Sequence, residues 1–553
     1  MEMAFMKYSK EKPVVLVSIV TGETIPNDLK PDKMNLEEEE PIIPPKQNIP
    51  WYKEVKGYSV YVLLILLLTY LLNQLDRYML AITVKPMAQE IHFGDLGCMV
   101  NETYPSDLTK GTSCKANTTE NCALITKNGS VVCKWDYLGS GFQYQLVAGP
   151  IFIVIYTFMG IFIGFLADRY NRKVLLAICL MFWSAMTLLT GFIGEYWQLV
   201  VLRLGLGAGE AGCTPFAASI ISDYFSESLR GSALGVYNWG IYTGYSMSYA
   251  IGNFITLANI NNQGWRWTFF IAGIPGLVLG IVMLITVKEP VRGNMRATAS
   301  DKQTAVTENV STCTKILNVA RPFFRPSLLL LCIAGSVRNS GGYVWAYNTQ
   351  PYFNALGTSL GKTSDETSEM VGSYMSWIPL VGGSIGVFVG GFISDRVVKK
   401  RGLYARIIVL VASQVLAAPF AAGTLYFDPP WAFICQIPTY IIGEMWVGVT
   451  LAVVIELVPI NARTTAVAVY LFIISNVGGN VPLIVPSLKQ AFSDLGYNSI
   501  TSLRAALYIL YPGTYIGGSA LFLLTMFVVK WDQENAQKYN AMNRSGSVNN
   551  KEK

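Results

Sequence analysis

The stretch Gly164-Phe-Leu-Ala-Asp168-Arg169-Tyr-Asn-Arg172-Lys173 has a second version later in the chain. That version, Gly391-Phe-Ile-Ser-Asp395-Arg396-Val-Val-Lys399-Lys400, keeps the glycine, the Asp-Arg pair and the two basic residues at the same spacing. A second segment also repeats without gaps, because the acid, arginine and tyrosine at Asp223, Arg230 and Tyr237 recur at Glu456, Arg463 and Tyr470. The chain is therefore expected to contain a duplicated half.

Composition places both halves in a membrane. Of the 553 residues, 52% are hydrophobic and 14% are charged, with a mean hydropathy of +0.38. A membrane-spanning helix needs about 20 mostly apolar residues. Twelve stretches fit, at 58–85, 141–167, 174–192, 197–222, 232–258, 268–287, 327–350, 370–394, 404–425, 432–456, 465–488 and 502–529. We expect an all-α membrane protein with twelve transmembrane helices in two six-helix halves, which is the major facilitator fold.

This reading divides the chain into a few segments. We expect two six-helix bundles, 58–287 and 327–529, joined by a cytosolic linker, 288–326. Residues 86–140 form one long loop inside the first bundle. The polar, Pro-rich segment 1–57 is expected to be a disordered cytosolic N-terminus. Residues 530–553 are expected to form a cytosolic tail.

Charge and cysteine usage predict the orientation. Lys and Arg gather in the loops after spans 2 and 8 and in the linker, so the positive-inside rule puts both termini in the cytosol. The net charge of +6 reflects these loops and indicates no nucleic-acid partner. The long loop carries cysteines and glycosylation sequons, which belong together on an oxidising side. We expect two disulfides in one of three pairings among Cys98, Cys114, Cys122 and Cys133, and glycans on Asn101, Asn117 and Asn128.

The repeated motifs have a mechanical interpretation. An aspartate in a cytosolic turn can accept from a helix N-terminus, and an arginine can pair with the acid that ends span 4 or span 10. We expect a cytosolic gating lock with Asp223 and Glu456 as the acidic partners. Orientation alone explains the basic residues, but not the glycine, the aspartate or the duplication. The predicted lock residues are Gly164, Asp168, Arg169, Arg172, Lys173, Asp223, Arg230, Gly391, Asp395, Arg396, Glu456 and Arg463.

Ionisable residues inside the spans are the second candidate site. Such a charge costs about 2.5–3.5 kcal/mol on insertion scales and usually faces a protein interior or a water-filled cavity. Span 1 carries Asn73, Asp76 and Arg77, which can share one side of the helix, and span 4 carries Arg203 and Glu210, two turns apart. Burial without a full partner disfavours an ionised carboxylate.

Glu210 has no obvious neighbour in the sequence, so we expect it to load and release a proton. Asp76, beside Arg77 and near Arg203, is expected to stay ionised as its charge partner across the cavity. A static network that fixes helix packing is the alternative. In the second half, the residues expected to line the cavity, or else to be packing residues, are Arg338, Asn339, Glu444 and Asn476.

The motifs resemble one family. Asn73-x-x-Asp76-Arg77, the stretch from Gly164 to Lys173, and Gly207-x-Gly-Glu210-Ala resemble the Spinster-like lipid transporters of the major facilitator superfamily. Trp265-Arg-Trp and Glu289-Pro-x-Arg-Gly extend the match, which covers roughly 58–293. The resemblance implies that Asp76 and Glu210 take part in proton-linked conformational change, supported by Arg203. It also implies a lysophospholipid or sphingolipid type of solute.

The sequence carries no ATP-binding loop, no zinc pattern outside the long loop, and a single histidine, His92. We therefore expect a secondary transporter rather than an enzyme, with no cofactor or metal and with protons as the coupling ion. It is expected to lie in the plasma or endolysosomal membrane, in contact with membrane lipid, and to need no protein partner. Two alternatives stay open: transport of a small organic anion on the same fold, and a non-transporting receptor or scaffold.

Overall fold

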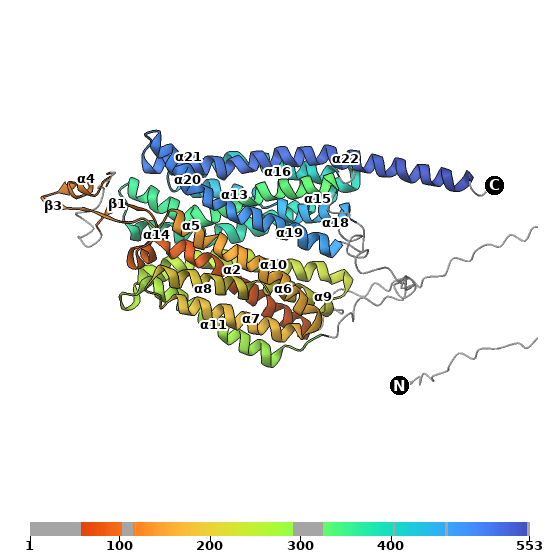
Figure 1. Cartoon of the computed structure of the whole chain (residues 1–553), viewed down its shortest axis with the longest axis horizontal. Helices are drawn as coiled ribbons and strands as arrows, with labels where there is room; N and C mark the ends of the chain where they lie inside the picture. The colour runs from red at the N-terminus through yellow and green to blue at the C-terminus, as the bar shows by residue number, and fades with distance from the viewer. Residues whose placement is uncertain are drawn as a thin grey trace, which may run out of the picture. The chain divides into compact units, whose positions relative to one another are not determined.

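The computed structural model describes residues 57–101, 114, 116, 118–290, 325–401, 404–458 and 463–549. Helices make up nearly all of this part, and the described strands lie in the loop after the first helix (Figure 1). The expected N-terminal segment 1–57 and linker 288–326 fall almost wholly outside the described residues.

The helices of the first half are long and apolar, so each satisfies its backbone hydrogen bonds internally, as a bilayer requires. The first helix continues six residues beyond the predicted span, to Ile91, even though Pro86 lies inside it. The elements are α2 (Gly57–Ile91), α5 (Phe142–Ala148), α6 (Pro150–Arg169), α7 (Arg172–Thr190), α8 (Tyr196–Glu210), α9 (Cys213–Tyr224), α10 (Glu227–Ala258), η1 (Ile260–Asn262) and α11 (Gly264–Thr286).

The second half follows the same plan and ends in a long helix that runs on beyond its neighbours (Figure 1). Helix therefore continues into the predicted tail, 530–553. The elements are α13 (Pro326–Ser359), α14 (Ser364–Met375), α15 (Ile378–Arg401), α16 (Tyr404–Tyr426), α17 (Trp431–Gly443), α18 (Trp446–Leu457), α19 (Arg463–Asn480), η4 (Val481–Leu483), α20 (Ile484–Asp494), α21 (Ser499–Leu510) and α22 (Pro512–Asn549).

Nine helices of the described chain are long and apolar enough to cross a membrane. The other three predicted spans coincide with α8 and α9, with α10 and with α13. These helices contain charged residues, among them Arg203 and Glu210 in α8 and Arg338 in α13. The twelve-helix architecture is consistent with this set of helices.

Glycines let the helices of the first half approach closely, as is common in membranes. A Cβ on Gly207 would press on Phe152 of α6, and one on Gly209 would press on Trp183 of α7. These are the close contacts expected for the glycines of span 4. In the same way, Gly244 of α10 lies against the Leu71 carbonyl of α2.

The loop between α2 and α5 forms a small disulfide-bonded unit. Its strands pair antiparallel as β1 (Leu96–Val100) with β4 (Cys133–Tyr137) and β2 (Thr126–Lys127) with β3 (Ser130–Val131), beside the short helix α4 (Thr119–Ala123). The cysteines pair as Cys98–Cys122 and Cys114–Cys133, one of the three pairings that the sequence left open. The sulfurs of Cys98, Cys114 and Cys133 lie close together, but all three are in disulfides, so we assign no metal to them.

The sequons of this loop differ in exposure. Asn128 is exposed at the tip of the β2–β3 hairpin, where its φ of 52° suits an asparagine in a tight turn. Asn101 directly follows β1 and is half-buried, and Asn117 lies outside the described residues. Glycosylation stays a prediction at all three.

We call the end of the helix bundle that carries this loop the loop end, and the opposite end, where α11 finishes and α13 begins, the linker end. The halves are hydrogen-bonded from the middle to the loop end. The contacts there include Gln145 Nε2 to Asn348 Oδ1 (2.7 Å), Asn253 to Gln350 (3.3 Å), Lys85 to Ser364, and the Tyr144 hydroxyl to the Tyr347 carbonyl.

Towards the linker end the helices that face the other half are open. No atom of the described residues lies within 4 Å of a Cβ placed on Gly160 or Gly164 of α6, Gly231 or Gly235 of α10, or Gly391 of α15. Gly149 of the same first half, at the loop end, instead lies against the Gly479 carbonyl of the second half. The bundle is thus closed at the loop end and splayed towards the linker end.

Candidate functional site

An ion pair joins α2 to α8 in the middle of the first half. The Arg77 guanidinium donates to Glu210 Oε2 from Nη2 (2.9 Å) and from Nε (3.2 Å). Glu210 is fully buried, and Arg77 is 11% exposed. The guanidinium also lies over the Phe152 ring (4.8 Å) and the Tyr156 ring (5.1 Å) of α6, so aromatic faces complete its surroundings.

This pairing differs from the expected one, in which Glu210 had no neighbour and Asp76 accompanied Arg77. Consecutive helical residues point about 100° apart. Arg77 therefore faces α6 and α8, whereas Asp76 faces Trp183 and Thr187 of α7. Asp76 is buried, and neither of its carboxylate oxygens has a hydrogen-bond partner among the described residues. Its expected role as the charge partner of Glu210 stays a prediction.

Asn73 and Arg203 lie near this site without entering the ion pair. Asn73 is buried one turn before Asp76 and accepts from the Gln74 side chain (2.9 Å). Arg203 is also buried, with Glu210, Asp76, Tyr144 and Tyr347 in its surroundings. It therefore belongs to the same buried polar region.

The second half contains a matching pair at the corresponding helices. Arg338 of α13 lies 3.6 Å from Glu444, which follows α17, and donates to the Gly443 carbonyl (2.9 Å) and to Gln414 of α16. The Arg338 guanidinium also lies over the Tyr515 ring (4.0 Å) and the Trp446 ring (5.2 Å). The pair between spans 1 and 4 of the first half thus corresponds to the pair between spans 7 and 10 of the second half.

Both glutamates stand at a local irregularity of their span. Ala211 and Gly212 separate α8 from α9 directly after Glu210, and Glu444 and Met445 separate α17 from α18. All four residues keep right-handed helical dihedral angles, so each span continues through this point.

The two halves also touch at this depth. The Tyr242 hydroxyl of α10 donates to Glu444 Oε2 (3.3 Å), and the Thr157 hydroxyl of α6 donates to the Asn476 Oδ1 of α19 (2.6 Å). Asn339 instead donates to the Ile474 carbonyl (3.0 Å), which ties α13 to α19 within the second half. Glu444 and Asn476 therefore lie at the boundary between the halves, whereas Asn339 has a packing contact.

The expected partnership with Asp223 is found at the linker end of the first half. Arg172 Nη1 lies 2.7 Å from Asp223 Oδ2, and Arg172 Nε lies 2.8 Å from Glu289 Oε1. The Glu289 carboxylate also accepts from the Lys173 backbone N–H (2.8 Å), and the Lys173 ammonium donates to the Leu284 carbonyl (3.0 Å). One cluster thus holds together the ends of α7, α9 and α11.

The second half has an equivalent cluster around a residue that the motif did not identify. Arg406 of α16 lies 2.9 Å from Glu456 and 2.8 Å from Asp395. The repeat had suggested Lys399 and Lys400 as the counterparts of Arg172 and Lys173. Arg406 takes that place because it, like Arg172, stands at the beginning of the helix that follows the turn. Arg406 lies close to the start of the predicted span 404–425, and this position is the sequence signal that could have identified it.

The remaining lock residues have other surroundings. Arg230 donates to the Ser222 carbonyl (3.1 Å), and Arg396 is exposed with its guanidinium over the Phe392 ring (4.5 Å). Arg169 is exposed at the end of α6. The side chains of Asp168 and Arg463 lie outside the described residues. The ion pairs of these two clusters join helices of the same half, so a gating role for the lock stays a prediction.

The arrangement defines a class of protein: a polytopic membrane protein made of two similar halves, each with an arginine–glutamate pair inside its helix bundle. Residues 66–481 match the family model described as the Major Facilitator Superfamily. The chain belongs to this superfamily, and it is therefore a membrane transporter and not an enzyme.

Individual relatives confirm the Spinster-like resemblance. The chain is 27% identical to protein spinster homolog 1 of Xenopus tropicalis over 73% of this chain and 77% of that protein. It is also 27% identical to the sphingosine-1-phosphate transporter SPNS2 of Danio rerio, over 71% and 76%.

A solved structure supports the fold. The bacterial homolog of the human lysosomal transporter Spinster, in an inward-facing and occupied conformation, superimposes with a TM-score of 0.62 at 22% identity. The match covers 87% of this chain and 98% of that one.

Proposed function

We propose that this transporter moves an amphiphilic, lipid-like solute of the lysophospholipid or sphingolipid type by alternating access, with protons as the coupling ion. The observation that carries the proposal is the pair of Arg–Glu contacts, Arg77–Glu210 and Arg338–Glu444, one inside the helix bundle of each half. The relative named for sphingosine-1-phosphate transport supports this solute class.

The head of such a solute would be recognised by guanidinium groups. Arginine binds phosphate through two parallel N–H donors, and here two arginines approach the boundary between the halves. Aromatic rings beside both arginines, such as Tyr156 and Tyr515, offer apolar surface next to the charge. Binding of an amphiphile requires this combination of a charged group for the head and an apolar surface for the chain.

Closure at the loop end and openness towards the linker end support one state of an alternating-access cycle. In our proposal the disulfide-bonded loop faces the outside or the lumen and the linker end faces the cytosol. The structure then corresponds to the inward-facing state. Transition to the outward-facing state requires the contacts between α5 and α13, among them Gln145 to Asn348, to break.

The pairing of Arg77 supports the proposed coupling to protons. While Glu210 is ionised, it occupies two of the N–H donors of Arg77. A proton on Glu210 would neutralise its charge and release those donors for an anionic head. Asp76, buried and without a hydrogen-bond partner in the described part of the chain, is a second acid that can respond to protons in the same site.

The test is uptake into proteoliposomes that contain the purified full-length protein. Labelled sphingosine 1-phosphate and lysophosphatidylcholine are compared with a panel of small organic anions, with and without a pH gradient. We expect movement of at least one lipid, faster with the gradient. If only organic anions were taken up, the proposed lipid-like solute class would be wrong. If lipid uptake did not depend on the pH gradient, the proposed proton coupling would be wrong.

A further inference from the structure

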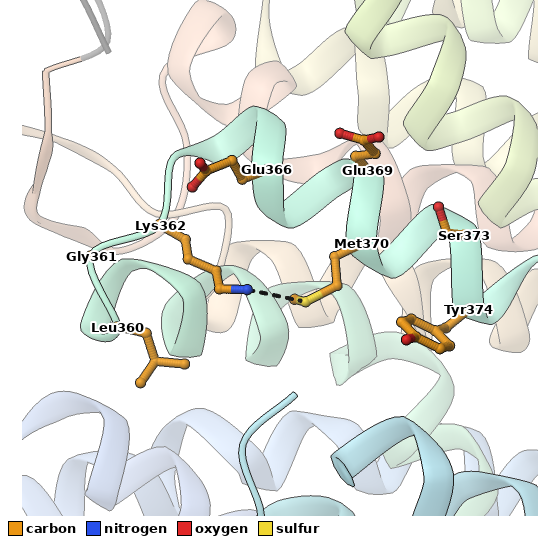
Figure 2. Close-up of a pocket in the computed structure, with 8 residues that line it drawn as sticks. All are labelled: Leu360, Gly361, Lys362, Glu366, Glu369, Met370, Ser373 and Tyr374. Atoms are coloured by element: carbon orange, nitrogen blue, oxygen red, sulfur yellow. Dashed lines mark hydrogen bonds between the residues drawn. The ribbon is translucent and has the colours of Figure 1, made fainter. Parts of the chain in front are cut away.

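A largely open surface pocket of about 640 Å³, called the cavity below, lies at the loop end of the second half, away from the Arg77–Glu210 and Arg338–Glu444 pairs. It is formed by the turn between α13 and α14 and by one face of α14. Figure 2 shows Glu366 and Glu369 on one side of it, and Leu360, Lys362 and Tyr374 on the other. The volume lies within the range of small-molecule sites.

The walls of this cavity are held in place by the local sequence. Gly361 has a φ of 72°, a left-handed conformation that glycine adopts without strain, and it ends α13 in a tight turn. Thr363 and Glu366 then form a capping box that starts α14. Residues 366, 369, 370, 373 and 374 follow at helical spacing and therefore share one face.

The charges of the cavity are of both signs. The Lys362 ammonium donates to the Met370 sulfur (3.6 Å), and a thioether is a weak acceptor. Glu369 is exposed at the opposite side, one turn after Glu366. A ligand that carries an anionic group beside Lys362 and a cationic group beside Glu369 would complement both. A purely anionic ligand would meet two carboxylates, and a purely cationic one would meet Lys362.

Apolar surface continues inward from these charges. Met370 and Tyr374 pack against the apolar core of the second half, and the Tyr374 ring stacks on Phe433 at 4.6 Å. The rigid aromatic side chain lies about two turns along the helix from Glu366. The cavity is thus polar at the turn and apolar further along α14, which is the polarity of an amphiphile.

We propose that this cavity binds a single-chain zwitterionic amphiphile, with its phosphate beside Lys362, its ammonium beside Glu369 and its chain along Met370 and Tyr374. The site is separate from the proposed transport site, so it does not depend on which solute the protein moves.

The experiment uses the full-length protein in nanodiscs and a lysophosphatidylcholine with a photoreactive chain. Crosslinked peptides are identified by mass spectrometry, and labelling of the segment around 360–374 is the readout. Dodecylphosphocholine is expected to compete, whereas dodecyl sulfate, dodecyltrimethylammonium and free phosphocholine are expected to compete poorly. Equal competition by free phosphocholine would overturn the assignment of an amphiphile.

Lys362→Gln and Glu369→Gln are each expected to lower labelling of this segment about 5-fold, the loss of one exposed charge contact. Both side chains are partly exposed, so the variants should fold. Lys134→Gln and Glu120→Gln, in the disulfide-bonded loop, are the matched controls and should label normally. Unchanged labelling in both cavity variants would overturn the site. Transport in the same variants should persist, so failure here leaves the proposed function standing.

Discussion

A buried arginine–glutamate pair such as Arg77–Glu210 adds little net stability, because desolvation of both charges offsets their attraction. Loss of one partner is different, since it leaves an uncompensated buried charge and costs about 3–5 kcal/mol. The same asymmetry suits a switch. We expect a proton on Glu210 to remove its charge from Arg77 as a substitution would, and to do so reversibly.

Glu210→Gln is therefore expected to abolish the pH dependence of transport. Glutamine keeps the size and one acceptor of glutamate but cannot ionise, so Arg77 stays released at every pH. The rate of lipid uptake into proteoliposomes, measured across a series of external pH values, should become flat in this variant and should vary in the wild type.

Glu444→Gln is the matched control for that experiment. Glu444 lies 3.6 Å from Arg338 and is 21% exposed, so its charge is more weakly tied to its arginine than that of Glu210. We expect this variant to keep its pH dependence. A pH profile of Glu210→Gln that matches the wild type, in protein that elutes as a single species, would assign the coupling to another acid such as Asp76.

The sequence identified the members of this site but not their partners. Depth in the membrane and rarity of charge pointed to Asp76, Arg77 and Glu210. Which carboxylate meets Arg77 depends on helix rotation, and adjacent residues diverge by about 100°. Hydropathy does not report rotation in a span that is apolar around most of its surface.

At the scale of elements, the linker end is tied by two ionic clusters of unequal burial. Arg172 is 5% exposed and pairs with Asp223 and Glu289, which are 11% and 22% exposed. Arg406 is 12% exposed, but Asp395 and Glu456 are 67% and 33% exposed. Water screens the second cluster more, so its ion pairs are worth less.

Arg172→Gln is accordingly expected to destabilise the protein more than Arg406→Gln. Loss of the first arginine leaves two poorly solvated carboxylates together, at a cost of up to about 3–5 kcal/mol, whereas exposed pairs are worth about 0–1 kcal/mol. Thermal unfolding in one detergent, followed by tryptophan fluorescence, measures the difference. Arg172→Lys should recover part of the loss. A larger shift for Arg406→Gln would contradict the ranking by burial.

The helices were predictable from the sequence where a long run of apolar residues marks a span. Each of the twelve predicted spans coincides with helix in the structure. The first motif located the turn between α6 and α7, whereas its repeat, Gly391 to Lys400, lies within α15. Arg406 was missed because α15 continues to Arg401, past the Asp395-Arg396 pair, whereas α6 ends at Arg169, so matched spacing pointed to Lys399.

At the scale of the whole molecule, the two halves are joined by polar contacts near the loop end and are open towards the linker end. Alternating access requires the loop-end contacts to be breakable. Side-chain hydrogen bonds such as Gln145 to Asn348 suit this task, because each contributes only about 0.5–1.5 kcal/mol net. The disulfide-bonded loop adds a further contact, since Asp95 lies 3.3 Å from Lys489 of α20.

Fixing the loop end shut should therefore stop transport without unfolding the protein. Gln145 and Asn348 come from different halves, and their side chains meet at 2.7 Å, so a reducible thiol crosslinker can join cysteines placed at both positions. In Gln145→Cys/Asn348→Cys, lipid uptake should fall in proportion to the crosslinked fraction and recover when the crosslinker is cleaved. The single-cysteine variants and the wild type, given the same reagents, account for effects on the native disulfides and free cysteines. Undiminished uptake by fully crosslinked protein would mean that the loop end need not open, and alternating access about this contact would have to be abandoned.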